Sequence, residues 1–234
     1  MLSGREIEKA IYDHRTWNKL DEACFGLGVL GRAWNYYRLK YAPRIVITPY
    51  NPKQLGPNSY NLRLGSHVVQ YVRNYDTPHD SPHGPANQLR LRPIDPYQVN
   101  DTKVHPIPNE GLRLDPGEIY LCSTVEYTEA HNCVPGIEGR SSIGRLGIDI
   151  HATAGFGDVG FCGRWTLEVS VVRPVIVYPR MEICQIFFDP IGPDHDPYEG
   201  KYQHDMMPAE SRLYQESKPL PPQDPPGQNL DKVV

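Results

Sequence analysis

Trp165-Thr166-Leu167-Glu168-Val169-Ser170-Val171-Val172 is the run of sequence that indicates the fold most strongly. Successive side chains of a strand point to opposite faces, so the apolar residues inside this run share one face and its hydroxyl and carboxyl groups share the other. The apolar face predicts a strand that packs on a core. The opposite face places Glu168 either in solvent or on the wall of a pocket, and solvent is the more common place for a strand carboxylate.

Short apolar segments recur on both sides of this run. Pro116-Gly117, Pro135-Gly136 and Pro179 predict turns between them. Many strands at short spacing, without alternating helices, indicate an all-β sandwich or barrel. The further strands that we expect cover residues 45–47, 60–64, 68–72, 89–91, 119–124, 136–138, 148–151, 175–178 and 183–188.

Helices are expected near the amino end. Ser3 and Glu6 have the spacing of a capping box, and apolar residues on one helical face follow, so a short helix is predicted there. Apolar residues also recur near helical spacing further on, although glycines weaken that pattern. We therefore predict one β domain over residues 1–214, with 12–44 as a helical insertion and 215–234 as a flexible proline-rich tail.

The composition limits the classes of partner. A net charge of −4 over 234 residues disfavours nucleic acid as a bulk partner. Five cysteines without a CxxC pair suggest reduced, buried thiols. The first residues show no apolar signal core, and no run approaches the roughly 18 apolar residues of a membrane helix. A soluble cytoplasmic protein that does not bind a membrane is expected.

Residues 139–147 have the composition of an anion cradle. They combine Arg140 and Arg145 with two adjacent hydroxyls and three glycines. Guanidinium groups bind phosphate oxygens bidentately, and glycines let backbone N–H groups approach an anion. The run is neither a Walker loop nor a dinucleotide fingerprint, and alone it is more often a solvated loop. Asp158, in the glycine-rich turn that follows, could bind a sugar hydroxyl, place a water or satisfy its own Asx turn.

The ligand patterns of zinc-dependent base deaminases do not occur in this sequence. Those enzymes carry His-x-Glu followed by Pro-Cys-x-x-Cys, which makes a metal-bound water the nucleophile. His79 and His83 are four residues apart but lie in a proline-broken loop, and His131-Asn132-Cys133 is no better as a metal site. If the protein deaminates a substrate, a carboxylate must therefore activate the water without zinc.

Four segments of the sequence together resemble the dCTP deaminase family in order and spacing: residues 139–147, 151–155, 158–163 and 166–168. That family shares its fold with dUTP diphosphatases. The resemblance implies a mainly β fold, a distorted barrel or jelly roll of the dUTP diphosphatase type with a few short helices. It also implies a homotrimer with active sites between subunits.

The resemblance implies zinc-independent hydrolysis of dCTP to dUTP and ammonia. Glu168 would move protons between water, N3 of cytosine and the departing amine, Ser141 would hold the water, and Arg145 would help to order the site. Magnesium would arrive on the triphosphate with no side-chain ligand from the protein, and dTTP is a candidate inhibitor. The other residues that the resemblance implies for nucleotide binding are Arg140, Ser142, Ile143, Gly144, Ala154, Asp158, Thr166, Leu167, Gln185, Tyr198 and Lys201.

Other functions remain open at this point. A bifunctional enzyme would also cleave dUTP to dUMP and pyrophosphate, because one cradle could serve both reactions. A nucleotide-binding regulator without turnover is conceivable, because Asp205 and Met207 stand where the family has Gln and Gly. A plain dUTP diphosphatase is disfavoured, since Glu168 in Thr-Leu-Glu belongs to the deaminase pattern. A modified dCTP could also be the substrate.

Overall fold

The computed structural model describes residues 1–11, 42–76 and 90–218, so the predicted insertion and tail fall mostly outside it. The chain divides into two compact units. The first is built from residues of 1–71 and 102–210, and the second from residues of 72–101 and 211–234. All residues that were predicted to bind or convert a nucleotide belong to the first unit.

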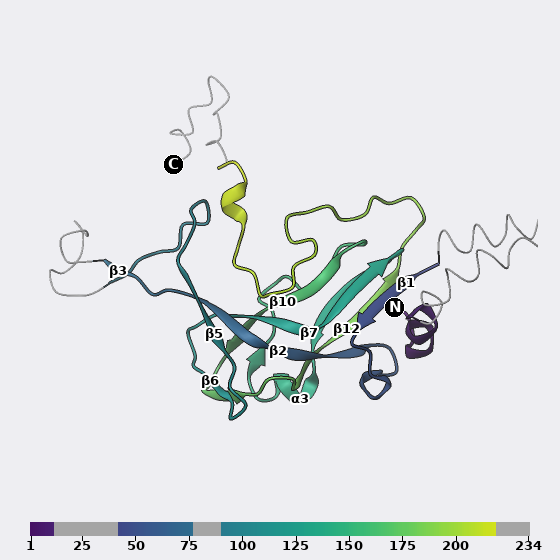
Figure 1. Cartoon of the computed structure of the whole chain (residues 1–234), viewed down its shortest axis with the longest axis horizontal. Helices are drawn as coiled ribbons and strands as arrows, with labels where there is room; N and C mark the ends of the chain where they lie inside the picture. The colour runs from purple at the N-terminus through teal and green to yellow at the C-terminus, as the bar shows by residue number, and fades with distance from the viewer. Residues whose placement is uncertain (12–41, 77–89, 219–234) are drawn as a thin grey trace, which may run out of the picture. The chain divides into compact units, whose positions relative to one another are not determined.

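An eight-stranded antiparallel sheet forms the first unit (Figure 1). The strands follow the order β8-β12-β2-β7-β10-β9, with β1 also paired to β7 and β5 to β2. These strands are β1 (Arg44–Thr48), β2 (Tyr60–Tyr71), β5 (Thr102–Pro106), β7 (Tyr120–His131), β8 (Cys133–Gly139), β9 (Ile148–Asp149), β10 (Cys162–Val171) and β12 (Glu182–Pro190).

Smaller elements complete the two units. In the first, β6 (Leu112–Leu114) pairs with β11 (Val175–Val177), α3 (Ser141–Gly144) is a single helical turn, and η2 (Pro52–Gln54) is a 3₁₀ turn. In the second, β3 (Tyr75–Asp76) pairs with β4 (Arg90–Leu91), and η3 (Leu213–Gln215) is a 3₁₀ turn.

The predicted capping box is confirmed at the amino end. Residues 4–11 are helical. The backbone N–H of Ser3 donates to Oε2 of Glu6 at 2.7 Å, and the N–H of Glu6 donates to Oγ of Ser3 at 3.4 Å. Each side chain therefore satisfies a backbone group that the first helical turn leaves without a partner.

The two ends of the strand order are joined by hydrogen bonds, so the sheet is nearly closed. Residues 155–157, which follow β9, lie along β8. Ile137 N–H donates to Gly155 O at 2.7 Å, and Gly157 N–H donates to Pro135 O at 2.9 Å. Closure covers the exposed edges of a sheet. The predicted mainly β, barrel-like fold with few helices is confirmed.

The predicted alternation along β10 is also confirmed. Leu167 and Val169 are buried, whereas Thr166, Glu168 and Ser170 are partly exposed. Burial of each such apolar side chain contributes about 1.5–3 kcal/mol. The core therefore fixes which face of β10 carries the carboxylate.

The segments predicted as two strands on either side of Gly65 form one strand, β2. Its register against β7 shifts between Leu64 and Val68, which marks a bulge or irregularity. A Cβ on Gly65 would lie 2.7 Å from Oγ of Ser123 on β7. The prediction of two strands was wrong because the glycine permits a close approach of two strands instead of ending one.

The turn predicted at Pro135-Gly136 was wrong as well. Both residues lie inside β8 and pair with Phe188 and Phe187 of β12. Proline donates no backbone hydrogen bond and is tolerated at a sheet edge, and β8 is the end of the strand order. A Cβ on Gly136 would lie 2.2 Å from the Phe187 ring, so the glycine makes room for an aromatic side chain.

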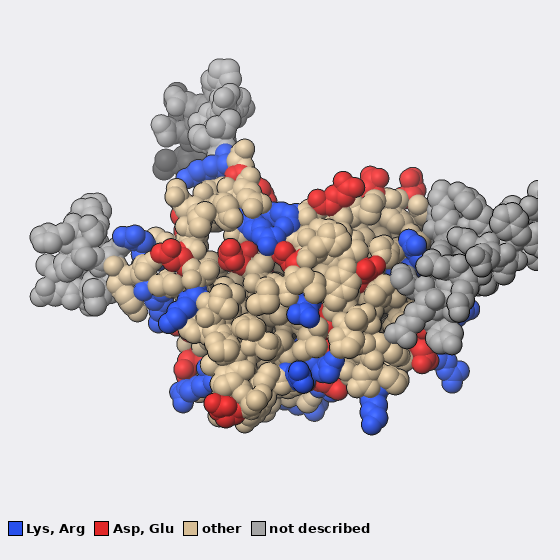
Figure 2. Space-filling model, in the orientation of Figure 1, with Lys and Arg blue, Asp and Glu red and all other residues tan. Residues whose placement is uncertain are grey.

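Charge is mixed on the molecular surface. Figure 2 shows Lys and Arg side chains interspersed with Asp and Glu on the face drawn, consistent with 24 basic and 28 acidic residues in the sequence. Among the described residues, no helix has the length and hydropathy needed to cross a membrane.

A buried carboxylate ties β2 to β7. Glu126 is fully buried. Its Oε1 accepts from Nε of Arg63 at 2.6 Å and from Nε2 of Gln54 at 3.0 Å, and its Oε2 accepts from the backbone N–H of Arg63 at 2.8 Å. A buried charge is tolerated only when it is paired and hydrogen-bonded, and both conditions hold here.

Replacing this carboxylate tests its contribution. Glu126→Ala leaves the Arg63 guanidinium without its anion and should lower the free energy of unfolding by about 3–5 kcal/mol in urea denaturation. Asp115→Ala is the control, because its ion pair with Arg113 is exposed and should contribute little. Equal stability of the two variants would contradict this assignment.

Candidate active site

Glu168 is presented on β10 by two neighbouring strands. It pairs with Leu121 of β7, and two residues further on Ser170 pairs with Asp149 of β9. Oε2 of Glu168 accepts a hydrogen bond from the backbone N–H of Ala152 at 3.1 Å. One carboxylate oxygen is therefore fixed by the backbone, and the segment that contains Ala154 is attached to the same side chain.

The predicted anion cradle contains one helical turn, α3. Ile143 is buried, whereas Ser141, Ser142, Gly144 and Arg145 are exposed. The buried isoleucine anchors the turn to the core, which leaves both hydroxyls and one guanidinium directed outward. These groups are hydrogen-bond donors suited to phosphate oxygens.

A glycine ends this turn next to β10. Gly147 has a φ of +77°, which a residue with a side chain rarely adopts. Its carbonyl accepts from the backbone N–H of Val172 at 2.9 Å, and a Cβ at Gly147 would lie 2.3 Å from the Val172 side chain. The cradle is thereby fastened to the residue that follows β10.

Arg140 and Gln185 fasten the start of the cradle to β12. Nη2 of Arg140 lies 3.1 Å from Oε2 of Glu182, and Nη1 donates to the Glu182 carbonyl at 2.9 Å. Gln185 donates from Nε2 to Gly139 O at 3.3 Å and accepts at Oε1 from Oγ of Ser59 at 2.9 Å. The two arginines of the motif thus differ, since Arg140 is held in an ion pair and Arg145 is exposed.

One chain brings only part of the predicted site together. In the described ranges, no hydrogen bond joins the Glu168 carboxylate to Ser141 or Arg145, and its partner is the Ala152 amide. The Asp158 side chain is exposed in the turn before β10. Within one chain, the cradle and the carboxylate are therefore separate groups.

The segment 198–210, which contains Tyr198 and Lys201, runs beside β10. It makes backbone hydrogen bonds to Cys162 at 2.7 Å and to Arg164 at 2.8 Å. The backbone N–H of Ala209 donates to Oγ1 of Thr166 at 3.1 Å. The predicted binding residues of this segment are therefore attached to the strand that carries Glu168.

No function was predicted for Gln203 from the sequence. Its Nε2 donates to the carbonyls of Gly160 at 2.9 Å and Tyr198 at 3.1 Å, and its Oε1 accepts from the N–H of Cys162 at 2.9 Å. The only signal was its place two residues after Lys201, which the family resemblance implies for nucleotide binding. In this structure its amide fixes the segment 198–210 to the start of β10.

A comparison with known protein families identifies the family of this chain. The family model described as dCTP deaminase-like matches residues 34–191. The chain belongs to the dCTP deaminase-like family.

Relatives of this family are similar over most of their length. A protein of Cytophaga hutchinsonii named "dCTP deaminase, dUMP-forming" is 47% identical over 178 residues, which cover 76% of this chain and 92% of that protein. A protein of Clostridium acetobutylicum with the same name is 45% identical over 173 residues, 74% of this chain and 90% of the relative.

One solved structure matches this chain at lower sequence identity. The crystal structure of 2'-deoxycytidine 5'-triphosphate deaminase from Agrobacterium tumefaciens matches with a TM-score of 0.43 and 23% identity, over 62% of this chain and 43% of that chain.

The names of the dCTP deaminase-like relatives correct one expectation. The sequence favoured dUTP as the end product, whereas the relatives are named for forming dUMP. The expectation of dUTP was therefore wrong, and the findings support the bifunctional alternative better.

Removing the Gln203 amide tests the attachment of the segment 198–210. Gln203→Ala deletes three hydrogen bonds to backbone groups, each worth about 0.5–1.5 kcal/mol, so backbone amides there should exchange with solvent roughly tenfold faster or more. Hydrogen–deuterium exchange at Cys162 and Arg164 measures this. Gln215→Ala, the same change in the second unit, is the control, and unchanged exchange in Gln203→Ala would contradict the assignment.

Proposed function

We propose that this protein converts dCTP and two waters to dUMP, ammonia and pyrophosphate. The first water replaces the 4-amino group of the base, and the second cleaves the bond between the α- and β-phosphates. The observation that carries the proposal is the shared name of relatives, "dCTP deaminase, dUMP-forming", at 47% and 45% identity over 92% and 90% of their lengths.

Glu168 is the proton-transferring group in the proposed deamination. Since Oε2 is occupied by the Ala152 N–H, Oε1 is the oxygen that accepts a proton from the attacking water. As the water oxygen bonds to C4, the carboxyl group passes this proton to N3. It then moves the hydroxyl proton to the amine, the C4–N bond breaks, and ammonia leaves as the C4 carbonyl forms.

The cradle supplies the groups that hold water and phosphates. Ser141 orients the attacking water, and Ser142, Arg145 and the backbone of α3 bind triphosphate oxygens, with Lys201 as a further cation. Their support is the exposure of both hydroxyls and of the Arg145 guanidinium on α3. Arg140 positions the cradle through its ion pair with Glu182 of β12.

The donor set of the cradle fits phosphates and not a bare cation. Residues 139–147 offer hydroxyls, guanidinium groups and backbone N–H groups, and none of them carries a carboxylate. Glu138 directly precedes this range. Magnesium would therefore be held through the nucleotide's phosphates and not by a side chain of residues 139–147. When bound, it neutralises phosphate charge during cleavage of the anhydride.

The remaining predicted residues select the nucleoside. In this proposal Ala154 lines the base pocket, Asp158 lies against deoxyribose, and the backbone of Thr166 and Leu167 contacts the pyrimidine. The two polar side chains that complete the site are Gln185 and Tyr198. Competition by dTTP is expected for the same reason, because it shares the triphosphate and the deoxyribose.

A homotrimer would complete this site. Glu168 and the cradle are not hydrogen-bonded within the described part of one chain, so a neighbouring subunit can supply the missing half. Phe156, Leu146 and Val172 are 79%, 51% and 68% exposed. Large exposed apolar side chains near a site mark interaction surfaces.

Product analysis tests the proposed function. Purified protein incubated with dCTP and magnesium should release ammonia, dUMP and pyrophosphate in equal amounts, because both hydrolyses act on the same nucleotide. Ammonia with stable dUTP and no pyrophosphate would contradict the proposal. Nucleotide binding without any product would indicate a regulator instead.

Glu168→Gln separates chemistry from binding. Loss of the general base should reduce ammonia release by about 10²–10⁴-fold while dCTP binding largely persists. Glu110→Gln, an exposed carboxylate in a loop, is the matched control. Unchanged ammonia release in Glu168→Gln would remove this residue from the mechanism.

A further inference from the structure

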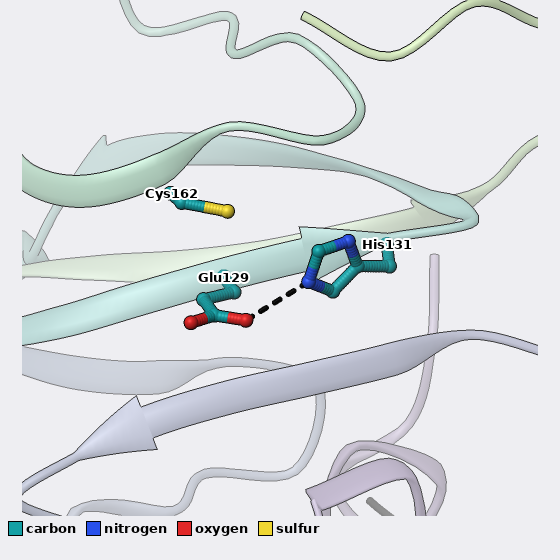
Figure 3. A group of neighbouring side chains, drawn as sticks. All are labelled: Glu129, His131 and Cys162. Carbon is teal, nitrogen blue, oxygen red and sulfur yellow. Dashed lines mark hydrogen bonds and ion pairs between the residues drawn. The ribbon is translucent and has the colours of Figure 1, made fainter. Parts of the chain in front are cut away.

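A second group of chemically reactive side chains lies on β7 and β10. Glu129, His131 and Cys162 bring a carboxylate, an imidazole and a thiol together, with their ligand atoms all within 4.8 Å of one another (Figure 3). Nothing in the proposed deamination or phosphate cleavage uses these residues.

Strand geometry explains why they meet. Glu129 and His131 are two apart on β7 and so point to the same face. The register places Cys162 of β10 directly opposite Glu129. Figure 3 shows the Cys162 sulfur directed toward the pair formed by the other two side chains. Three ligand types therefore converge on one patch of the sheet.

The three side chains are buried or partly buried, and one side of the group is accessible to a small ion. Cys162 is buried, while the side chains of Glu129 and His131 are 25% and 28% exposed. Partial burial limits the rotamers available to each ligand and weakens screening by solvent. An ion could still enter from the exposed side.

A further hydrogen bond orients the carboxylate. The Tyr127 hydroxyl donates to Oε1 of Glu129 at 3.0 Å, and Oε2 lies 2.9 Å from Nε2 of His131. The two oxygens thus have different partners, and Oε2 faces the imidazole. Such outer partners commonly fix the orientation of metal ligands.

The Cys162 thiol interacts with Gly160 O and with the Tyr127 hydroxyl. It donates to Gly160 O at 3.4 Å. Burial, followed by the negative charge of Glu129, raises the pKa of Cys162, whereas the hydrogen bond with Tyr127 lowers it. A thiol must lose its proton to ligate a metal ion. A cation held by all three groups would displace this proton.

We propose that Glu129, His131 and Cys162 bind a divalent d-block cation, for which zinc is the best match. Zinc accepts sulfur, nitrogen and oxygen ligands at about 2.0–2.3 Å, which places tetrahedral ligands roughly 3.3–3.7 Å apart. The observed separations, 2.9 Å for oxygen to nitrogen and up to 4.8 Å overall, require only small side-chain rotations to reach this range. A water molecule would be the fourth ligand, because this group offers three.

The charges of the three ligands suit a dication. The carboxylate and the thiolate together balance its two positive charges. Arg44 of β1 pairs with His131 in the strand register. The positive charge of Arg44 opposes a cation bound beside it. Both anionic ligands are therefore needed to keep the site favourable for a cation.

The bound ion would be structural. Cys162 begins β10, and its backbone N–H donates to Gln203, so an ion would join β7 to the start of β10 and to the segment 198–210. Six residues of strand, roughly 20 Å, separate Cys162 from Glu168. The site is therefore independent of the water activation assigned to Glu168.

Metal titration of the full chain tests the proposal. After removal of metal with a chelator and dialysis, the protein should bind about one Zn²⁺ per chain, and Co²⁺ should give a thiolate-to-cobalt absorption band. Cys162→Ser should lose the band, and His131→Asn should bind Zn²⁺ at least about tenfold more weakly. Cys122→Ser and His67→Asn, the same changes elsewhere in the first unit, should keep both signals.

The decisive variant is His131→Asn, because a partly exposed side chain can be replaced without disturbing the core, even if Cys162→Ser fails to fold. Circular dichroism confirms that each variant is folded. Absence of zinc binding by the unaltered chain would overturn the proposal. Undiminished affinity in folded His131→Asn, or a cobalt band that survives Cys162→Ser, would overturn it equally.

Discussion

Burial of one face of β10 is the constraint on which the rest of the structure depends. Leu167 and Val169 must leave water, and because the side-chain period of a strand is two, this burial decides that Glu168 emerges on the other face. A slip of one residue would bury the carboxylate and expose the apolar side chains. Pairing with β7 holds the register, and β7 is itself tied to β2 through the buried ion pair of Glu126 with Arg63. Core packing therefore determines the face of β10 on which the candidate catalytic group lies, and the Ala152 amide then orients its carboxylate.

Local patterns were sufficient for the fold wherever one face of an element is buried. The alternation of β10 and the Ser3–Glu6 capping box depend on neighbours within a few residues, and both predictions are confirmed. The strands β5 and β6 were missed, because the former is mostly polar and exposed and the latter is only three residues long. Pro135-Gly136 was misread as a turn because its strand context comes from β12 and the closing segment, which a local pattern cannot show.

In the candidate site, too, features that depend on nearby residues could be predicted from the sequence, and contacts between distant residues could not. The order of the motifs located the cradle and Glu168. The hydrogen bond from Ala152 to Glu168 and those made by Gln203 join residues that are distant in sequence, so the motifs could not predict them. The motif also could not predict the end product, because deamination alone and deamination with phosphate cleavage place the same demands on a triphosphate cradle. The grouping of Glu129, His131 and Cys162 arises from strand register, so it has no counterpart in the spacing rules used to find metal ligands in sequences.

In the proposed mechanism, Glu168 of one subunit acts on a nucleotide held by the cradle of another. Two variants test it most directly: Glu168→Gln, which lacks the general base, and Arg145→Ala, which lacks a phosphate-binding guanidinium. They are mixed and allowed to exchange subunits, at a dCTP concentration at which each alone is inactive. In a randomly mixed assembly, about a quarter of the sites would combine an intact carboxylate with an intact cradle, so ammonia release should return to about that fraction of the unaltered activity. If the mixture stays as inactive as its components although exchange is demonstrated, the carboxylate and the cradle do not act together across subunits.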